Sequence, residues 1–342
     1  MQNIDKIKQI HYFKCVTNKD NQYIEFLKTK IAPHITPNLA QNMLDFCLSP
    51  KIHSNILSQI KQQHLSPLTT NTTPTIHIIL GQPGAGKSTL ANHLLKIYTN
   101  TLLIDQDIYK PFHPLSSQIL QYSPSYYGHL TGIDSHLFTQ NILDTAIKNK
   151  YNILIQLAPT QKPFLDEINL NALLQNNYKI NLHILAVSLP NILLSIHERY
   201  EDQLQNHYPT PKLTDLNRAI NSHHSLQNWL NNLPFHNIHQ TTIYVRNYSQ
   251  NHQNPPFPTT ITSLQSQTPL FQHIHTTPQE LLHHFSTLQN YDLTQIIHSV
   301  PNRINTILHS MNTRQAPQSQ QTQFKEIIQI IKSTPNPINI KK

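Results

Sequence analysis

The chain has 342 residues, of which 37% are hydrophobic and 12% charged, and its formal net charge is +8. This length allows one large domain or two modest ones, and the low charged content excludes a strongly charged disordered chain. The lysines are scattered, which favours a basic surface without a dedicated nucleic-acid partner. No apolar run approaches the ~18 residues of a membrane span, and the first residues lack a signal-peptide core. Because the two cysteines, Cys15 and Cys47, form no CxxC pattern, we expect a cytoplasmic protein without a disulfide framework.

Two helical segments flank a central stretch of alternating elements. In residues 1–65 apolar side chains recur at helical spacing (Ile24 and Ile31, Ile56 and Ile60), and a polar, Pro-containing linker follows at 66–75. From residue 76 short apolar strands alternate with helices, which predicts an α/β fold whose parallel sheet is covered by helices on both faces. We expect strands at 76–80, 101–105, 151–158, 180–189 and 241–248, and helices at 90–98, 135–149, 163–176, 190–206 and 214–232.

The last third of the chain carries no chemical motif. Residues 249–270 are rich in Pro, Gln, Thr and Ser and predict a loop, and a helical part follows at 277–312. The run RQAPQSQQTQ interrupts the helical pattern, and we expect a last helix at 323–333 before a flexible tail. We therefore divide the chain into an N-terminal helical extension (1–70), a central α/β domain (71–255) and a C-terminal helical region (256–342), and we expect the extensions to pack onto the core.

The loop GQPGAGKST between the first strand and its helix is a phosphate-binding motif. It matches GxxxxGK(S/T) at every fixed position, and it holds three of the five glycines in the chain. Small residues let backbone N–H groups wrap the phosphates, and the following helix points its positive end at them. Lys87 would reach the β- and γ-phosphates, and the Ser88 hydroxyl would hold Mg²⁺. This predicts ATP or GTP, with Mg²⁺, bound by Gly81, Gln82, Pro83, Gly84, Ala85, Gly86, Lys87, Ser88 and Thr89.

Two further segments carry candidate catalytic residues. Asp105 and Asp107 follow the strand at 101–105, at the sheet edge where ligands sit, so they could accept a hydroxyl proton or bind Mg²⁺. The alternative is that they cap the following helix, and we favour the catalytic interpretation. In the helix at 190–206, Arg199 could offset the charge that develops in phosphate transfer. A surface ion pair is the alternative there, and the segment alone favours it.

Taken in order, GQPGAGKST, DQDIYKPFHP, YNILIQ and AVSLPNILLSIHERYE resemble the zeta toxin family of P-loop kinases over about residues 70–250. The resemblance implies a kinase domain at 71–255 that phosphorylates UDP-N-acetylglucosamine, and a toxin that is neutralised by an antitoxin protein. It implies that Asp107 is the base that activates the sugar hydroxyl and that Arg199 engages the transferred phosphate. It also implies that His113, in the His-Pro turn, shapes the substrate side.

The sequence departs from the family pattern in the acceptor half. Gln156 stands where the family has a Glu at the end of the third strand, and Gln140 aligns with a further family Glu. A glutamine can accept a hydrogen bond but cannot act as a base. A second family arginine falls near Tyr208, where Lys212 or Arg218 could stand in for it, although a lysine does not reproduce the bidentate fork of an arginine. The nucleotide half therefore matches the family, and the pocket that would include Gln140 and Gln156 is altered.

Three functions are compatible with this pattern. The leading hypothesis is a kinase of zeta-toxin type acting on UDP-N-acetylglucosamine or another nucleotide sugar. The second is a nucleotide-binding module with a degenerate pocket that serves protein contacts. The third is a P-loop kinase for another acceptor, such as a nucleoside or an antibiotic. We expect neither a nucleic-acid nor a membrane partner.

Overall fold

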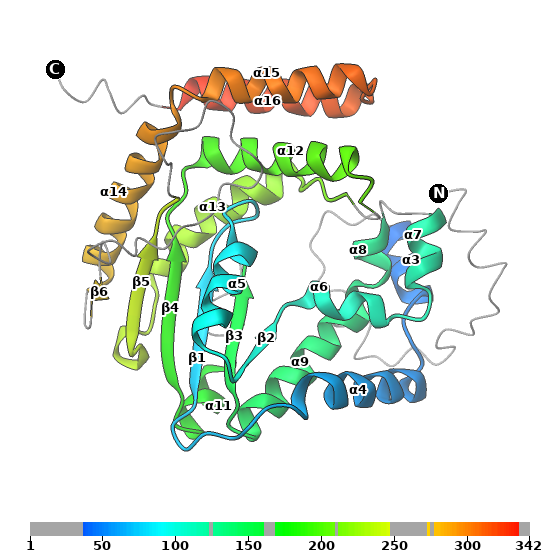
Figure 1. The fold of residues 1–342 in the computed structure, drawn as a ribbon, viewed down its shortest axis with the longest axis vertical. Helices are drawn as coiled ribbons and strands as arrows, with labels where there is room; N and C mark the ends of the chain where they lie inside the picture. Colours follow the sequence, from blue (N-terminus) through cyan, green and yellow to red (C-terminus); the bar gives the residue numbers. More distant parts are fainter. Residues whose placement is uncertain are drawn as a thin grey trace. The chain divides into compact units, whose positions relative to one another are not determined.

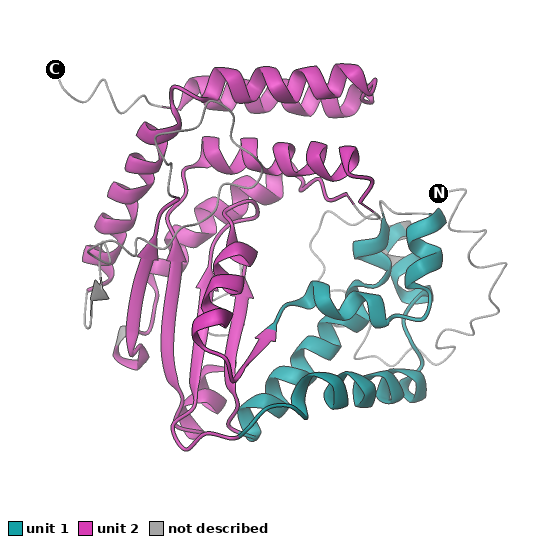
Figure 2. Cartoon of the chain, viewed as in Figure 1, with its two compact units in different colours: residues 1–69, 104–149 teal, residues 70–103, 150–342 magenta. Residues whose placement is uncertain are grey.

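The computed structural model describes residues 37–122, 126–160, 168–208, 211–246, 272–273 and 277–334. The chain forms two compact units, which Figure 2 colours separately. Unit 1 comprises residues 1–69 and 104–149, and unit 2 comprises residues 70–103 and 150–342. The N-terminal helices thus share a unit with the segment after the second strand, and the C-terminal helices share one with the phosphate-binding loop. The predicted helices around Ile24 and Ile31, the loop at 249–270 and the tail after 334 lie outside the described residues.

The sheet has the strand order β2-β3-β1-β4-β5-β6. β1 pairs in parallel with both β3 and β4, and β4 pairs in parallel with β5, so the predicted α/β fold with a parallel sheet is confirmed. The antiparallel β6 was not predicted, because two residues carry no alternation. The strands are β1 Thr75–Leu80, β2 Thr101–Ile104, β3 Asn152–Leu157, β4 Lys179–Leu185, β5 Gln240–Tyr244 and β6 Gln272–His273.

β1 lies in the middle of this sheet and is buried on both faces. Ile76, Ile78 and Leu80 on one face and Ile79 on the other are fully buried. A strand with a near-continuous apolar run is typical of a parallel sheet with helices on both sides. Among the described residues, the helices of unit 2 are α5 Lys87–Ile97, α11 Leu170–Gln175, α12 Leu189–Gln205, α13 Leu216–Asn231, α14 Pro278–Ile296, α15 Val300–Thr313 and α16 Gln318–Ser333, with a short 3-10 turn η3 at Phe235–Asn237.

The C-terminal helices pack onto the core of unit 2, as expected. α15 and α16 run alongside α12 (Figure 1), and Ile307, Met311 and Phe324 join the apolar cluster that includes α5 and α12. α16 begins at Gln318, five residues before the predicted start. The reason is that its first turn is polar and exposed, so its apolar periodicity begins only at Phe324.

The described residues of unit 1 form helices, and one buried carboxylate joins its two chain segments. Asp134 Oδ2 accepts a hydrogen bond from the Leu48 N–H at 3.0 Å, and Oδ1 lies 2.8 Å from His53 Nδ1. The His53 ring also stacks on Phe138, with centroids 4.3 Å apart. The helices are α3 Pro37–Asp45, α4 Pro50–Leu65, α6 Gln106–Tyr109, α7 Ser116–Tyr122, α8 Tyr127–Leu130 and α9 Gly132–Lys148, with a 3-10 turn η1 at Lys110–Phe112. α7 and α8 were not predicted, because they are too short to show periodicity, and α6 was considered only as the helix that Asp105 and Asp107 could cap.

A line of polar rings crosses the sheet from β1 to β5. His77 Nδ1 lies 2.9 Å from His183 Nε2, and His183 Nδ1 lies 2.9 Å from the Tyr244 hydroxyl. Burial lowers the pKa of His77 to about 4 and, together with the charge of His77, the pKa of His183 to about 3. Both rings are therefore neutral at pH 7, and each can donate from one nitrogen and accept at the other along the line.

These histidines predict a loss of stability in acid. Their folded pKa values lie below the unfolded value of 6.5, so the folded state resists protonation. The free energy of unfolding therefore has its full value above pH 6.5 and falls as the pH drops toward 4. The loss is about 2 kcal/mol for His77 alone at pH 5. The His77 ring also stacks on Tyr98, with centroids 4.0 Å apart. We expect His77→Phe, which keeps a ring in this place, to show a smaller loss of unfolding free energy between pH 7.5 and pH 5 than the wild type. Equal losses in denaturant titrations would contradict this.

Candidate functional site

The loop from Gly81 to Gly86 joins β1 to α5, which is the strand-loop-helix arrangement that the motif requires. Gly84 and Gly86 have φ values of +81° and +99°, which lie in the left-handed region that favours glycine. At Gly84 a Cβ would lie 2.8 Å from Ile196 Cγ1 and 3.0 Å from the Ile192 carbonyl oxygen, both on α12. Any larger residue there would have to push α12 away from the loop.

Lys87 and Ser88 are the first two residues of α5. The Lys87 side chain contacts the loop, and the Ser88 side chain contacts β3. Lys87 Nζ donates to the carbonyls of Gly81 at 2.8 Å and of Gln82 at 3.0 Å. These carbonyls hold the ammonium against the loop, where phosphate oxygens could replace them as acceptors. The Ser88 hydroxyl donates to the Gln156 side-chain oxygen at 3.3 Å.

Gln156 lies near the carboxyl end of β3, where it is in register with Ile79 of β1. Its contact with Ser88 places its amide beside the predicted Mg²⁺ ligand. The structure thus brings together the loop, Lys87, Ser88 and Gln156.

Arg246 and His223, which no motif identified, make hydrogen bonds to the loop. Arg246, two residues after β5, donates to the Gly84 carbonyl. Gln82 is fully buried, and its Nε2 lies 3.2 Å from His223 Nδ1 on α13. Burial and the neighbouring His224 lower the pKa of His223 to about 4, so the ring is neutral at pH 7 and Nδ1 can accept from the amide. Neither contact has a local sequence signal, because the partners lie 162 and 141 positions apart.

The side chains of the ERYE segment of α12 (residues 198–201) contact two parts of the chain: the C-terminal helices and the segment at 212–214. Glu198 forms an ion pair with Arg303, and Glu201 forms one with Arg314 at 2.6 Å, so the ion pairs of this motif are made by its glutamates with C-terminal helices. Arg199 Nη2 lies 3.5 Å from both the Lys212 carbonyl and Thr214 Oγ1.

The residues proposed to replace the second family arginine differ in their surroundings. Lys212 belongs to the segment that contacts Arg199, and its N–H donates to Gln203 Oε1 at 2.7 Å. Tyr208 is 59% exposed, and Arg218 is exposed near the start of α13. Lys212 is therefore the candidate whose backbone lies beside Arg199.

The remaining predicted residues belong to unit 1. Asp105 is the N-cap of α6, and its Oδ1 accepts from the Asp107 N–H at 3.0 Å. The capping alternative thus applies to Asp105, whereas the Asp107 side chain is 46% exposed and pairs with Lys110 Nζ at 2.6 Å. His113 is buried: its Nε2 donates to the Phe46 carbonyl at 2.9 Å and its Nδ1 accepts from the Leu115 N–H at 3.2 Å. Gln140 is half-buried on α9.

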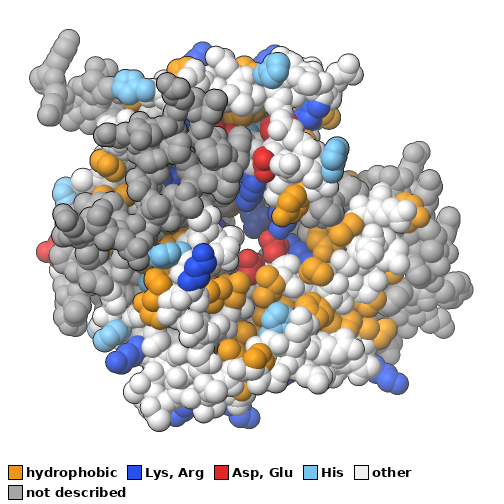
Figure 3. Space-filling view, viewed as in Figure 1, with side chains coloured by type: hydrophobic (Ala, Val, Ile, Leu, Met, Phe, Trp, Pro, Cys, Tyr) orange, Lys and Arg blue, Asp and Glu red, His pale blue; other side chains and the backbone are white. Residues whose placement is uncertain are grey.

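Other kinds of site are not evident in the described part of the chain. Among those residues, no group of three or more His, Cys, Asp or Glu side chains is arranged to hold a metal ion. None of the described helices is both long and apolar enough to span a membrane. On the face drawn in Figure 3, lysine and arginine side chains occur at several separate places.

Comparison with known proteins gives one family and one informative fold. The profile described as zeta toxin matches residues 60–254, and a search of curated proteins gives no match. A solved structure of the PezAT chromosomal toxin-antitoxin system of Streptococcus pneumoniae has a TM-score of 0.55 at 15% identity, covering 77% of this chain and 98% of that one. A crystal structure of AvrRxo1-ORF1:-ORF2 with ATP has a TM-score of 0.40 at 12% identity, covering 63% and 70%. At these identities the PezAT likeness establishes the fold alone.

Gly84 offers a direct test of the loop geometry. We expect Gly84→Ala to weaken nucleotide binding by at least ~10-fold, because it combines a left-handed φ with a clash against α12. Gly132→Ala is the matched control, since a Cβ there meets nothing within 4 Å. Titration with a fluorescent ATP analogue measures both. Equal affinities for the two variants would show that the loop tolerates a side chain at Gly84.

Proposed function

The chain belongs to the zeta toxin family, and from this premise we propose that it is a kinase that transfers the γ-phosphate of ATP to a hydroxyl of a nucleotide sugar, UDP-N-acetylglucosamine first. The observation that carries the proposal is the loop with Lys87 held over its carbonyls and Ser88 beside the end of β3. A loop of this shape at a helix N-terminus is suited to a triphosphate. GTP is the alternative donor.

The residues around Ser88 fit a magnesium ion. The Ser88 hydroxyl and the Gln156 amide supply two oxygens 3.3 Å apart, and oxygen is the ligand type that Mg²⁺ takes together with substrate phosphates. When bound, Mg²⁺ offsets the phosphate charge. Both protein oxygens are neutral, so the negative charge around the ion would come mainly from the nucleotide.

Asp107 and Arg199 take the remaining chemical roles in the proposal. The exposed carboxylate of Asp107 accepts the proton of the sugar hydroxyl, and Lys110 holds the carboxylate at the start of α6. Arg199, near Lys212 and Thr214, stabilises charge on the transferred phosphate. Gln140 and Gln156 contact the acceptor, and His113 shapes the acceptor side through the turn before α7.

We further propose that the chain is the toxin of a toxin-antitoxin pair. The support is the family match and the name of the PezAT system, a toxin-antitoxin system, to which the fold is similar. The partner would be an antitoxin protein.

The kinase proposal is tested with purified full-length chain, Mg²⁺, either ATP or GTP, and UDP-N-acetylglucosamine. We expect a sugar product heavier by one phosphate by mass spectrometry. Asp107→Asn should lower the rate ~10²–10⁴-fold, because an amide cannot take the proton. Asp105→Asn is the matched control, since asparagine caps a helix as well as aspartate does. Equal rates for wild type and Asp107→Asn would remove Asp107 from catalysis, and product only with nucleosides or antibiotics would identify another acceptor class.

The second candidate is a nucleotide-binding module without transfer activity. The neutral Gln156 beside Ser88 favours it, because the family pattern has a carboxylate at this strand end. Nucleotide binding without turnover for any acceptor, unaffected by Asp107→Asn, would select this function over the kinase.

Gln156 itself makes a further prediction. We expect Gln156→Glu to lower the Mg²⁺ concentration needed for half-maximal ATP binding by ~10-fold, because a carboxylate is a stronger ligand for a hard cation than an amide. Gln156→Ala, which removes the oxygen, should raise that concentration. Titration of Mg²⁺ at fixed ATP measures both variants. Unchanged Mg²⁺ dependence in both would place Gln156 outside the metal site.

A further inference from the structure

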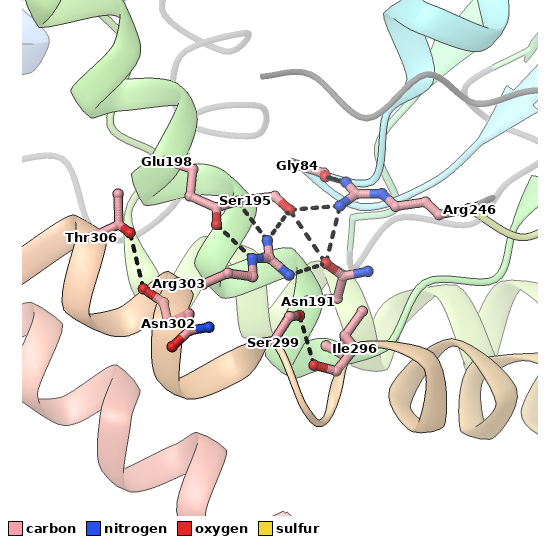
Figure 4. Close-up of polar contacts among 10 residues, drawn as sticks. All are labelled: Gly84, Asn191, Ser195, Glu198, Arg246, Ile296, Ser299, Asn302, Arg303 and Thr306. Atoms are coloured by element: carbon pink, nitrogen blue, oxygen red, sulfur yellow. Dashed lines mark hydrogen bonds and ion pairs between the residues drawn. The ribbon is translucent and has the colours of Figure 1, made fainter. Parts of the chain in front are cut away.

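We propose that Arg246 and Arg303 are positioning residues for the phosphate-binding loop, so that the C-terminal helix α15 sets the affinity for nucleotide. The inference rests on the proposed nucleotide binding by this loop. Its basis is a continuous polar connection from Arg303 through Asn191 and Ser195 to Arg246 and the Gly84 carbonyl, drawn in Figure 4. We call this connection the arginine relay.

At the loop end, the relay fixes one peptide unit from both sides. Arg246 donates from Nη2 to the Gly84 carbonyl, and the N–H of the same peptide, on Ala85, donates to the Gln82 carbonyl at 3.1 Å. Because a peptide unit is planar, bonds at both its carbonyl and its N–H set its orientation. The curvature of the loop therefore depends on where the Arg246 guanidinium lies.

In the middle of the relay, α12 fixes that guanidinium. Arg246 is 8% exposed, and its Nη1 donates to Asn191 Oδ1 at 3.1 Å and to Ser195 Oγ at 2.6 Å. Asn191 is fully buried, and its Nδ2 donates to both carboxylate oxygens of Asp292 on α14, at 3.0 and 3.1 Å. The Asn191 amide is thus oriented with its oxygen toward the arginines.

At the far end, Arg303 contacts the same two acceptors. It donates to Asn191 Oδ1 at 2.9 Å and to Ser195 Oγ at 3.1 Å, and it makes two bonds of 2.5 Å to the Glu198 carboxylate. Two guanidiniums therefore share one amide oxygen and one hydroxyl, with Glu198 and Asp292 supplying two negative charges. A change at Arg303 alters the acceptors that hold Arg246.

The simpler interpretation is that Arg303 only anchors α15 to α12. Arg314 provides the comparison, because it makes an equivalent bidentate contact to Glu201 at 2.8 and 2.6 Å, further along the same two helices. The Arg314 guanidinium also donates to Gln320 on α16, at 2.8 Å, and lies over the Tyr200 ring. Both arginines anchor α12, but Arg303 also shares acceptors with Arg246.

The test compares Arg303→Met with Arg314→Met in the full-length chain. We expect both to lower the melting temperature, but Arg303→Met alone to weaken MgATP binding, by ~10-fold, as for loss of charged hydrogen bonds. Arg314→Met should bind MgATP within ~2-fold of wild type, since it leaves the relay intact. Calorimetric titration without an acceptor measures the affinity, so the result does not depend on phosphate transfer. Equal affinities for both variants would overturn the inference, even if the wild type proves to be a kinase.

Two smaller changes keep the inference testable if Arg303→Met does not fold. Arg303→Lys keeps the positive charge but loses the guanidinium that makes two bonds to Glu198. It should therefore bind MgATP more tightly than Arg303→Met and more weakly than the wild type. Ser195→Ala removes one oxygen that both arginines contact, and it should weaken binding several-fold with little change in melting temperature. Wild-type affinity in Ser195→Ala and Arg303→Lys would count against the relay.

Discussion

The close contact between Gly84 and α12 is the constraint on which the rest of unit 2 depends. The loop reaches the helix only because Gly84 has no side chain, and its left-handed backbone aims the carbonyl at Arg246. α12 is thereby tied to the phosphate-binding loop as well as to the sheet. Whatever holds α12 in place, including the helices that follow residue 277, contributes to the shape of the loop.

α12 serves this role because its faces have different partners. Ile192 and Ile196 belong to the apolar cluster beneath the loop, Glu198 and Glu201 bind arginines of α15 and its C-terminal end, and Arg199 faces the segment at 212–214. The ERYE motif therefore combines a candidate catalytic arginine with two glutamates that fix the helix. Part of its sequence pattern is explained by packing and part by the proposed chemistry.

The sequence was informative where the determinants are local. Apolar runs located the five parallel strands, and glycine spacing located the loop between β1 and α5, because both patterns occupy neighbouring residues. The short helices α6, α7 and α8 and the polar first turn of α16 have no such pattern. The contacts of Gln156, His223 and Arg246 join residues 68, 141 and 162 positions apart, so the fold had to be known before they could be found. The roles of Asp107, Arg199, His113 and Gln140 stay predictions.

The interleaved path of the chain limits how it can be shortened. Unit 1 is made of residues 1–69 and 104–149, and Asp134 in the second segment binds the Leu48 N–H and His53 in the first. A truncation that starts at residue 70 would leave the Asp134 carboxylate without either of these partners and would uncover the face of α9 that packs on α4. The smallest piece of this protein that preserves both units is therefore not the segment that matches the family, but one that keeps the N-terminal helices and the C-terminal ones as well.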